Sequence, residues 1–335
     1  MLDALARGQT LAEDEAEAAF GIIMQGDATP AQIAGLLMAM RVRGETVAEL
    51  TGAVRAMRAR MATVAAPPDA MDVCGTGGDG AGTLNISTAN ALVLAGCGVP
   101  VAKHGNRALS SRSGGADVLA ALGVYVDVPL HRLPAILEAA GCVFLFAPRH
   151  HAAMRHAAGP RVELGTRTIF NLLGPLANPA NVQRQLTGVF DPGWARPMAE
   201  ALARLGTRSA WVVHGAGLDE LTLAGENQVA VIREGHVTTC LVSPEDAGLG
   251  RAPVAAILGG DPATNAAALL ALLHGTEGAY RGTVLLNVAA ALMIAGRADN
   301  LRDGVGQAAA AIDGGAALAV LEALRRETCL DADPE

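Results

Sequence analysis

The sequence predicts an α/β protein, with a small N-terminal all-helical domain and a larger α/β domain built on a mostly parallel central sheet. Residues 1–64 carry only helical patterns, whereas the chain beyond residue 68 alternates short apolar runs with helical segments. Such alternation is typical of a parallel sheet covered by helices on both faces. Apolar residues make up 51% of the 335 residues, which suffices for a large buried core.

The N-terminal segment is predicted to be helical from its start signals. Capping boxes at Thr10–Glu13, Thr29–Gln32 and Thr46–Glu49 each precede apolar residues at helical spacing. Ala65–Pro68 then breaks the pattern, as a linker does. We therefore expect one domain over 1–64 and a second over 69–335, with 162–183 as a segment that could pack on the first.

Beyond the linker, apolar runs and helical patterns predict strands and helices in turn. Strands are expected at Met71–Cys74, Val99–Ala102, Val124–Val126, Cys142–Phe146, Leu186–Phe190, Ala210–His214 and Val229–Ile232. Helices are expected at 86–97, 115–122, 131–140, 194–205, 264–273 and 283–295.

Charge and composition exclude several classes of function. The chain has 25 basic and 33 acidic residues, a net charge of −8, and only 3% aromatic residues. Both values argue against nucleic acid as a partner, since phosphate backbones and bases are held by basic and aromatic surface. The five cysteines include no CxxC pair, which predicts a reduced, cytoplasmic protein. No signal peptide is evident, and the longest apolar segment is too short to span a membrane.

A glycine-rich turn follows the first predicted strand. Gly75–Asp79 reads GTGGD, and free N–H groups of such turns bind phosphate oxygens at the carboxyl ends of strands. With Gly80, the run also satisfies the G-x-G-x-x-G pattern of dinucleotide-binding folds, which usually have an acid at the end of the next strand. Lys103–Arg107 stands there instead, and its charge favours additional phosphate over a bare ribose.

Two further loops are rich in small hydrogen-bond donors. Asn85–Thr88 opens the helix after the glycine turn, and Ser110–Gly115 precedes the following helix. Either loop alone is typical of an ordinary capped helix start. Three donor-rich loops around one sheet favour a ligand with more than one phosphate.

Taken together, these segments resemble a known family, the anthranilate phosphoribosyltransferases. The likeness runs from the first helix to about residue 327, and its combination of motifs is far more specific than any one of them. The motifs occur in the family's order: Gly75–Asp79 (GTGGD), Asn85–Thr88 (NIST), Lys103–Arg107 (KHGNR), Arg167–Pro179 (RTIFNLLGPLANP) and Gly217–Glu220 (GLDE). The sequence departs from the family at His151–Met154, where HPAM is frequent, and at Arg112 and Gly115, where lysine and serine are frequent.

The resemblance implies transfer of a phosphoribosyl group from phosphoribosyl pyrophosphate (PRPP) to the amine of anthranilate, with release of pyrophosphate, in tryptophan biosynthesis. It implies an enzyme that needs Mg²⁺, with two ions per active site. It also implies a homodimer formed through the N-terminal helices, and a fold shared with the pyrimidine nucleoside phosphorylases. Neither nucleic acid nor a membrane is expected as a partner.

The resemblance also implies a role for individual residues. Those expected to bind PRPP are Gly75, Thr76, Gly77, Gly78, Asp79, Thr83, Asn85, Ser87, Thr88, Lys103 and Ser111. Those expected to bind anthranilate are Gly75, Asn106, His151 and Arg161. The metal is expected at Ser87, Asp219 and Glu220, and the catalytic residues implied are Lys103, Asp219 and Glu220.

The residue types fit this chemistry. Substitution at the anomeric carbon passes through an oxocarbenium-like state while pyrophosphate departs with several negative charges. Backbone N–H groups, Lys103 and a divalent metal would stabilise those charges, and Mg²⁺ prefers carboxylates such as Asp219 and Glu220. The aromatic amine is neutral at pH 7, so no strong general base is needed. Arg161 can pair with the substrate carboxylate through two hydrogen bonds.

Three other functions are weighed against this one. A pyrimidine nucleoside phosphorylase would carry a lysine-histidine-serine motif in place of the first glycine loop, and the chain lacks it. A non-catalytic nucleotide-binding relative would lose GTGGD and the acidic pair. An NADP-dependent oxidoreductase fits only the glycine pattern.

Overall fold

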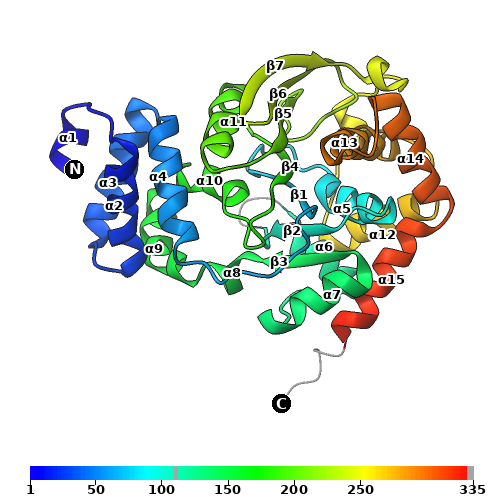
Figure 1. Cartoon of the computed structure of the whole chain (residues 1–335), viewed down its shortest axis with the longest axis horizontal. Helices are drawn as coiled ribbons and strands as arrows, with labels where there is room; N and C mark the ends of the chain where they lie inside the picture. Colours follow the sequence, from blue (N-terminus) through cyan, green and yellow to red (C-terminus); the bar gives the residue numbers. More distant parts are fainter. Residues whose placement is uncertain (109–111, 330–335) are drawn as a thin grey trace.

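The computed structural model describes residues 1–108 and 112–329. A bundle of N-terminal helices lies at one end of the molecule and an α/β region at the other, as Figure 1 shows. This arrangement confirms the expected fold class. The five cysteines are free thiols in this structure.

Four helices form the N-terminal bundle: α1 (Leu2–Ala6), α2 (Glu13–Gln25), α3 (Pro30–Arg43) and α4 (Val47–Arg58). The capping boxes of α3 and α4 are confirmed, because the hydroxyls of Thr29 and Thr46 accept the N3 amides at 3.3 and 3.2 Å. The predicted cap at Thr10 was wrong. Residues 9–12 are not helical, since Leu11 turns inward to the core, and α2 begins after Ala12.

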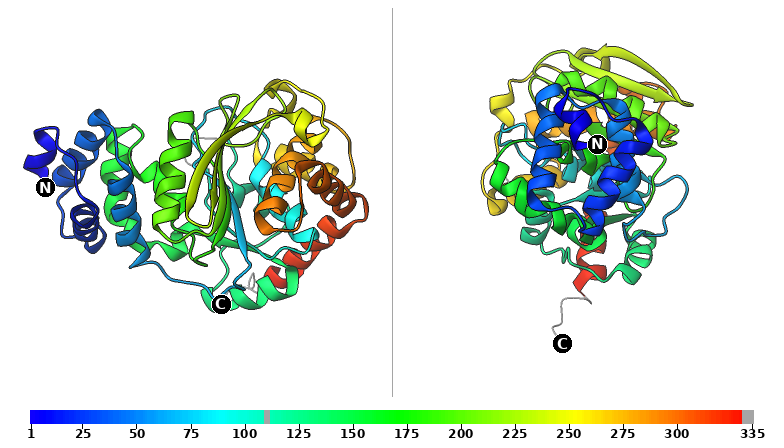
Figure 2. Two further views of the ribbon diagram at one scale, coloured as in Figure 1. Left: turned by 45° about the horizontal axis from the view of Figure 1, so that its top comes forward. Right: turned by 90° about the vertical axis from the view of Figure 1, so that its left-hand side faces the viewer.

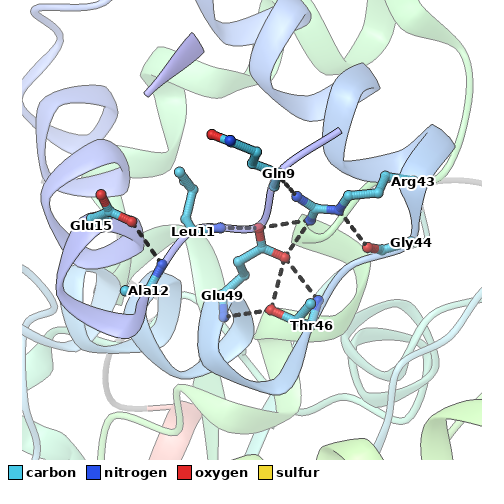
Figure 3. Close-up of polar contacts among 8 residues, drawn as sticks. All are labelled: Gln9, Leu11, Ala12, Glu15, Arg43, Gly44, Thr46 and Glu49. Carbon is cyan, nitrogen blue, oxygen red and sulfur yellow. Dashed lines mark hydrogen bonds and ion pairs between the residues drawn. The ribbon is translucent and has the colours of Figure 1, made fainter. Parts of the chain in front are cut away.

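A buried carboxylate holds this first turn in place. Glu49 is fully buried on α4 and accepts the Leu11 amide at 2.9 Å and the Thr46 amide at 2.9 Å (Figure 3). The Arg43 guanidinium bonds both Glu49 oxygens, and it also donates to the carbonyl of Gln9. One side chain therefore ties the segment before α2 to the loop between α3 and α4.

We expect Glu49→Gln to destabilise the protein by about 2–4 kcal/mol, because the amide places a donor against Arg43 and leaves that partly buried cation without its counter-charge. Guanidinium unfolding followed by circular dichroism measures the loss. The matched control is Glu200→Gln, which removes the exposed Arg196 ion pair and should cost no more than about 1 kcal/mol. Equal midpoints for the two variants would show that the Glu49 network adds nothing to stability.

Seven strands form one sheet in the order β3-β2-β1-β4-β5-β6-β7. The first five in that order are parallel, and β5, β6 and β7 pair antiparallel. The strands are β1 (Met71–Gly75), β2 (Val101–Gly105), β3 (Cys142–Phe146), β4 (Arg184–Gly188), β5 (Ser209–Gly215), β6 (Asn227–Arg233) and β7 (His236–Val242). Six of the expected strands are confirmed, with ends shifted by a few residues.

Two strand predictions need correction. Val124–Val126 forms no strand: both valines are buried, and the Tyr125 amide donates to Thr328 of the C-terminal helix at 3.1 Å. The alternation of buried valines with an exposed residue in this segment therefore results from packing against helices and not from a strand. β7 was not predicted, because at the sheet edge most of its side chains are exposed and form no apolar run. The positive φ angles of Glu234 and Gly235 mark the hairpin turn that precedes it.

Helices cover both faces of the sheet (Figure 2). Along β5, Ala210 and Val212 join the core shared with the N-terminal helices, whereas Trp211 and Val213 join the core under α5 and α13. The first face packs on α4, α9 (Arg155–Leu164), α10 (Phe170–Leu173) and α11 (Ala195–Arg204). The second packs on α5 (Ile86–Gly96), α6 (Gly115–Ala121), α7 (Leu133–Ala140), α12 (Pro262–Leu273), α13 (Ala279–Ala295), α14 (Leu301–Asp313) and α15 (Ala316–Cys329).

The six predicted helices beyond residue 85 are all present, and five more were not predicted: the four-residue α8 (Ala147–His150), α9, α10, α14 and α15. In the described part of the chain no single helix is long and apolar enough to cross a membrane. The one pair that passes together, α14 with α15, is bent by 57°.

The strand order fixes where a ligand can bind. From β1 the chain builds outward through β2 and β3, and then returns through α8 (Ala147–His150), α9 and α10 to place β4 on the other side of β1. The order therefore reverses between β1 and β4. In sheets of this kind the crevice at the carboxyl ends of the two strands at the reversal is the binding site.

Candidate active site

Close backbone packing brings a turn after β5 across the ends of β1 and β4. A Cβ atom on Gly188 would lie 1.4 Å from the Asp219 carbonyl oxygen, and one on Gly75 would lie 2.2 Å from Asp219 Oδ2. Both strands must therefore end in glycine. The Asp219 carboxylate consequently meets the glycine turn, where the Gly77 amide donates to Oδ2 at 2.7 Å.

A first cavity of about 180 Å³ opens beside this contact, and we call it the acidic cavity. It collects the glycine turn, the start of α5, the start of α6 and the turn after β5. Of the residues expected to bind PRPP or metal, it is lined by Gly75, Gly77, Gly78, Asp79, Thr83, Asn85, Ser87, Asp219 and Glu220. Segments more than 130 residues apart in the chain thus meet in one space.

Two carboxyl groups of this cavity have raised pKa values. Burial and the neighbouring Asp79 carboxylate raise the pKa of Asp219 to about 7. Burial and the Asp219 charge raise the pKa of Glu220 well above its usual value. Both shifts mean that the carboxylates lack a compensating positive charge, which a cation in the cavity would supply.

The donor set fits magnesium. Within residues 1–108 and 112–329, no three His, Cys, Asp or Glu side chains are arranged to hold a metal ion by themselves. Mg²⁺ does not require such a cage, since it keeps several waters and binds through one or two carboxylates together with substrate phosphates. Asp219 and Glu220, with the Ser87 hydroxyl on the same cavity wall, provide such a set.

Lys103 lies beneath the acidic cavity. Its side chain is buried, and its ammonium donates to the Val73 carbonyl at 2.8 Å and to the Ser87 hydroxyl at 3.2 Å. Lys103 is one of the charges acting on Glu220, where it opposes the rise in pKa. In this structure Lys103 therefore acts on the cavity from below, through Ser87 and through its charge.

The part of the acidic cavity that comes from the start of α12 was not predicted from the sequence. Asn265 at the start of α12 donates to Asn85 Oδ1 at 2.8 Å and accepts the Gly260 amide at 2.7 Å, and both Gly260 and Asn265 line the cavity. Asn85 is also bonded to Ser113 of the loop before α6. Asn265 thus fixes the donor loop from 180 residues away, and its local sequence carries no motif.

A second cavity, of about 500 Å³, is also lined by Gly75, and we call it the arginine cavity. Its walls come from the ends of β1 and β2, from α8 to α10 and from α4. All the residues expected to bind anthranilate line it: Gly75, Asn106, His151 and Arg161. Gly75 lines both cavities, so they meet at this one residue.

Two neutral imidazoles form part of the wall of the arginine cavity. The rings of His104 and His151 lie 5.0 Å apart, and His104 Nδ1 contacts the Gly174 carbonyl at 3.1 Å. Burial and the neighbouring histidine lower the pKa of His104 to about 3 and that of His151 to about 4. Both are neutral at pH 7, and neither ring nitrogen of His151 has a partner among the described residues.

The segment 167–179 connects the two cavities to the sheet. Asn178 donates to the buried Asp72 carboxylate at 2.7 Å and to the Ala102 carbonyl at 2.8 Å. Arg167 donates to the Gly78 carbonyl and stacks over Phe190, with its guanidinium carbon 4.3 Å from the ring centroid. This motif therefore positions the glycine turn, a role that its sequence alone did not reveal.

Two further residues expected to bind PRPP, Thr76 and Thr88, do not line the acidic cavity. Thr76 lines the arginine cavity, and its hydroxyl accepts the Phe190 amide at 3.0 Å. Thr88 is buried on α5, behind the acidic cavity, with a hydroxyl that has no partner among the described residues. Ser111 falls outside the described residues. Their assigned contacts stay predictions.

Comparisons with known proteins agree with this architecture. Two family models match the chain: the glycosyl transferase family helical bundle domain over residues 1–61, and the glycosyl transferase family a/b domain over residues 67–318. The anthranilate phosphoribosyltransferase of Brucella suis biovar 1 is 58% identical over 317 residues, covering 95% of this chain and 94% of that protein. The enzyme of the same name from Brucella ovis is 57% identical over the same length.

Solved structures give the same result. The anthranilate phosphoribosyltransferase of Thermus thermophilus superposes with a TM-score of 0.93 at 44% identity, covering 98% of this chain and 99% of that one. The Saccharomyces cerevisiae enzyme in complex with PRPP and Mg has a TM-score of 0.86 at 28% identity, covering 96% and 94%. The yeast enzyme has also been solved with 4-fluoroanthranilate.

Proposed function

The chain belongs to the family of anthranilate phosphoribosyltransferases, which move the 5-phosphoribosyl group of PRPP to the amine of anthranilate, and we propose that its two cavities divide these substrates between them. It is a pentosyltransferase of tryptophan biosynthesis, and its products are N-(5-phosphoribosyl)anthranilate and pyrophosphate. One observation carries the division: the acidic and arginine cavities share Gly75 and no other lining residue.

PRPP is assigned to the acidic cavity. Gly75, the turn Gly77–Asp79 and the residues Thr83, Asn85 and Ser87 line the space where its phosphates would lie. The resemblance adds Thr76, Thr88 and Ser111 to this set. Lys103 contributes positive potential from below as the pyrophosphate gains charge.

Mg²⁺ is assigned to Ser87, Asp219 and Glu220, and we propose two ions per site. Bound there, it would neutralise the charge that develops on the leaving pyrophosphate. The Gly77 amide fixes one Asp219 oxygen toward the glycine turn, so that carboxylate stays oriented in the cavity. The PRPP and Mg complex of the yeast relative supports the assignment of magnesium.

Anthranilate is assigned to the arginine cavity. Arg161 is half-buried, its guanidinium carbon lies 5.2 Å from the Phe170 ring centroid, and burial lowers its pKa. A substrate carboxylate would compensate that desolvated charge, and Asn106 and His151 lie on the same wall. The amine would then point toward Gly75 and the anomeric carbon beyond it.

Catalysis then rests on position and electrostatics. Two reactants held on opposite sides of Gly75 react as one unit, which gives effective-molarity gains of about 10⁵ M or more in favourable systems. The neutral imidazoles of His104 and His151 border the space from which the amine proton must leave.

We expect Arg161→Ala to raise the KM for anthranilate by about tenfold to a hundredfold, because the substrate carboxylate loses a charge-assisted pair of hydrogen bonds. The KM for PRPP should change little, because Arg161 lines only the arginine cavity. Initial rates with each substrate varied in turn measure both constants. Equal weakening of the two substrates would refute the assigned role.

The apparent Mg²⁺ affinity should fall by about tenfold per pH unit below pH 7. The Asp219 pKa of about 7 means that protons compete with the metal below that pH, and each bound proton must leave before the metal binds. His104 and His151 should add no inflection near pH 6.5, since they stay neutral down to about pH 4. Activity titrated with MgCl₂ at several pH values measures the effect, and a constant Mg²⁺ affinity would contradict it.

The function itself is tested by mixing the protein with PRPP, Mg²⁺ and anthranilate and following the loss of anthranilate fluorescence. Signal loss that requires PRPP and stops with EDTA supports the proposal. Absence of turnover, or phosphorolysis of a pyrimidine nucleoside in its place, contradicts it.

We also propose a homodimer through the N-terminal helices in the cytoplasm, with domains at 1–64 and 69–335. The segment 162–183 supports a composite first domain, because Phe170 of that segment stacks edge-on against Phe20 of α2, with centroids 5.6 Å apart. Sedimentation of the full chain tests the dimer.

A further inference from the structure

The arginine cavity has an unusual balance of charge. Arg155 and Arg161 line it, and none of its described lining residues is Asp or Glu. The chain as a whole carries a net charge of −8, so a surface cavity with two cations and no acid stands apart from its surroundings. Such a local field attracts small anions and raises their rate of arrival.

The two arginines stand at different depths. Arg161 is half-buried against Phe170, whereas Arg155, at the first turn of α9, is exposed. Neither guanidinium pairs with a carboxylate in the described residues, although many arginines on the protein surface do so. Arg155 is therefore free to meet an anion before it reaches Arg161.

The acidic cavity carries the opposite charge. Asp79, Asp219 and Glu220 line it, with Arg112 as the only described basic residue on its wall. A free carboxylate is repelled there, whereas a phosphate ester accompanied by a divalent cation is not. The two cavities thus sort anions by whether they bring a metal with them.

We infer that Arg155 is a specificity-determining residue that captures the carboxylate of the acceptor at the mouth of the arginine cavity and directs it to Arg161. This inference rests on the proposed placement of anthranilate in that cavity. It assigns to Arg155 the selection of anionic over neutral aromatic amines. Because the capture occurs before the chemistry, it acts on kcat/KM for the acceptor and leaves kcat unchanged.

The test compares Arg155→Gln with Arg155→Lys, using anthranilate and its neutral isostere 2-aminobenzamide as acceptor or competitive inhibitor. Arg155→Gln should lower kcat/KM for anthranilate by about fivefold to tenfold at low ionic strength, and by less than about twofold in about 0.5 M KCl, where exposed charges are screened. Binding of 2-aminobenzamide and the KM for PRPP should not change, and Arg155→Lys should retain most of the rate.

The control is Arg196→Gln, which removes one positive charge from α11, away from the arginine cavity, and should leave kcat/KM unchanged. Three results would overturn the inference: no change in Arg155→Gln, an equal loss for the neutral amide, or a loss that salt does not diminish. If the wild-type protein and Arg161→Ala behave as expected while Arg155→Gln shows no effect, the inference fails and the proposed function stands.

Discussion

Asp219→Asn is expected to lower kcat/KM for PRPP by at least about a hundredfold, because it removes a metal-binding charge where the leaving pyrophosphate develops its own. The asparagine oxygen can still accept the Gly77 amide, now 2.7 Å from Asp219 Oδ2, so the fold of the turn should persist. Steady-state rates over a range of MgCl₂ concentrations measure the loss.

The same variant should gain stability in the absence of divalent metal. The pKa of Asp219 rises from an ordinary 3.8 to about 7 in the folded protein, so the folded state holds a proton that the unfolded chain releases. Stability is therefore lost as the pH rises from about 4 to 7. At pH 8 with EDTA, Asp219→Asn should melt above the wild type.

Asp246→Asn is the control, since it changes an exposed carboxylate that caps a loop turn and lines neither cavity. It should leave activity unchanged and add no stability. An Asp219→Asn enzyme with near wild-type kcat/KM, or with a lower melting temperature in EDTA, would contradict the role given to this acid.

Gly75→Ala should reduce kcat/KM for both substrates by about a hundredfold or more. The added methyl would lie 2.2 Å from Asp219 Oδ2 and 2.8 Å from its Cγ, so either the metal-binding acid or the glycine turn must move. Because Gly75 lies between the cavities, a shift of about 1 Å there separates the reactants as well. Initial-rate kinetics with each substrate varied in turn measure the loss.

Gly174→Ala provides the comparison within the arginine cavity. Gly174 also lines that cavity, but a Cβ on it meets nothing within 4 Å. We expect less than about a threefold change, since helical glycine accepts alanine without strain. If Gly75→Ala and Gly174→Ala had equal kcat/KM values, the close approach of Asp219 to β1 would not contribute to catalysis.

Much of the site could be predicted because its parts are local. A glycine turn after an apolar run, and polar residues at a helix start, report their own backbone geometry, so Gly75, Gly77–Asp79 and Asn85–Ser87 were found at the acidic cavity. Asn265 could not be found, because its role depends on a contact with Asn85 across 180 residues. Lys103 was expected to contact the phosphates, but it is buried beneath the cavity. The local sequence does not show how deeply a side chain is buried.

The errors in the predicted secondary structure also come from contacts between distant parts of the chain. Val124–Val126 alternates like a strand because helices bury its valines, and β7 lacks an apolar run because it lies at an exposed edge. Thr10 has the pattern of a cap, but Glu49 from α4 holds Leu11 and delays the start of α2. Tertiary contacts decided each case against the local pattern.

A crystal structure of the protein with PRPP, Mg²⁺ and anthranilate would show where the two substrates lie. We predict the pyrophosphate and metal against Asp219 and Glu220, the anthranilate carboxylate at Arg161, and the amine within about 3.5 Å of the anomeric carbon beside Gly75. Anthranilate bound outside the arginine cavity, or PRPP whose anomeric carbon faces away from Gly75, would contradict the division of substrates between the two cavities.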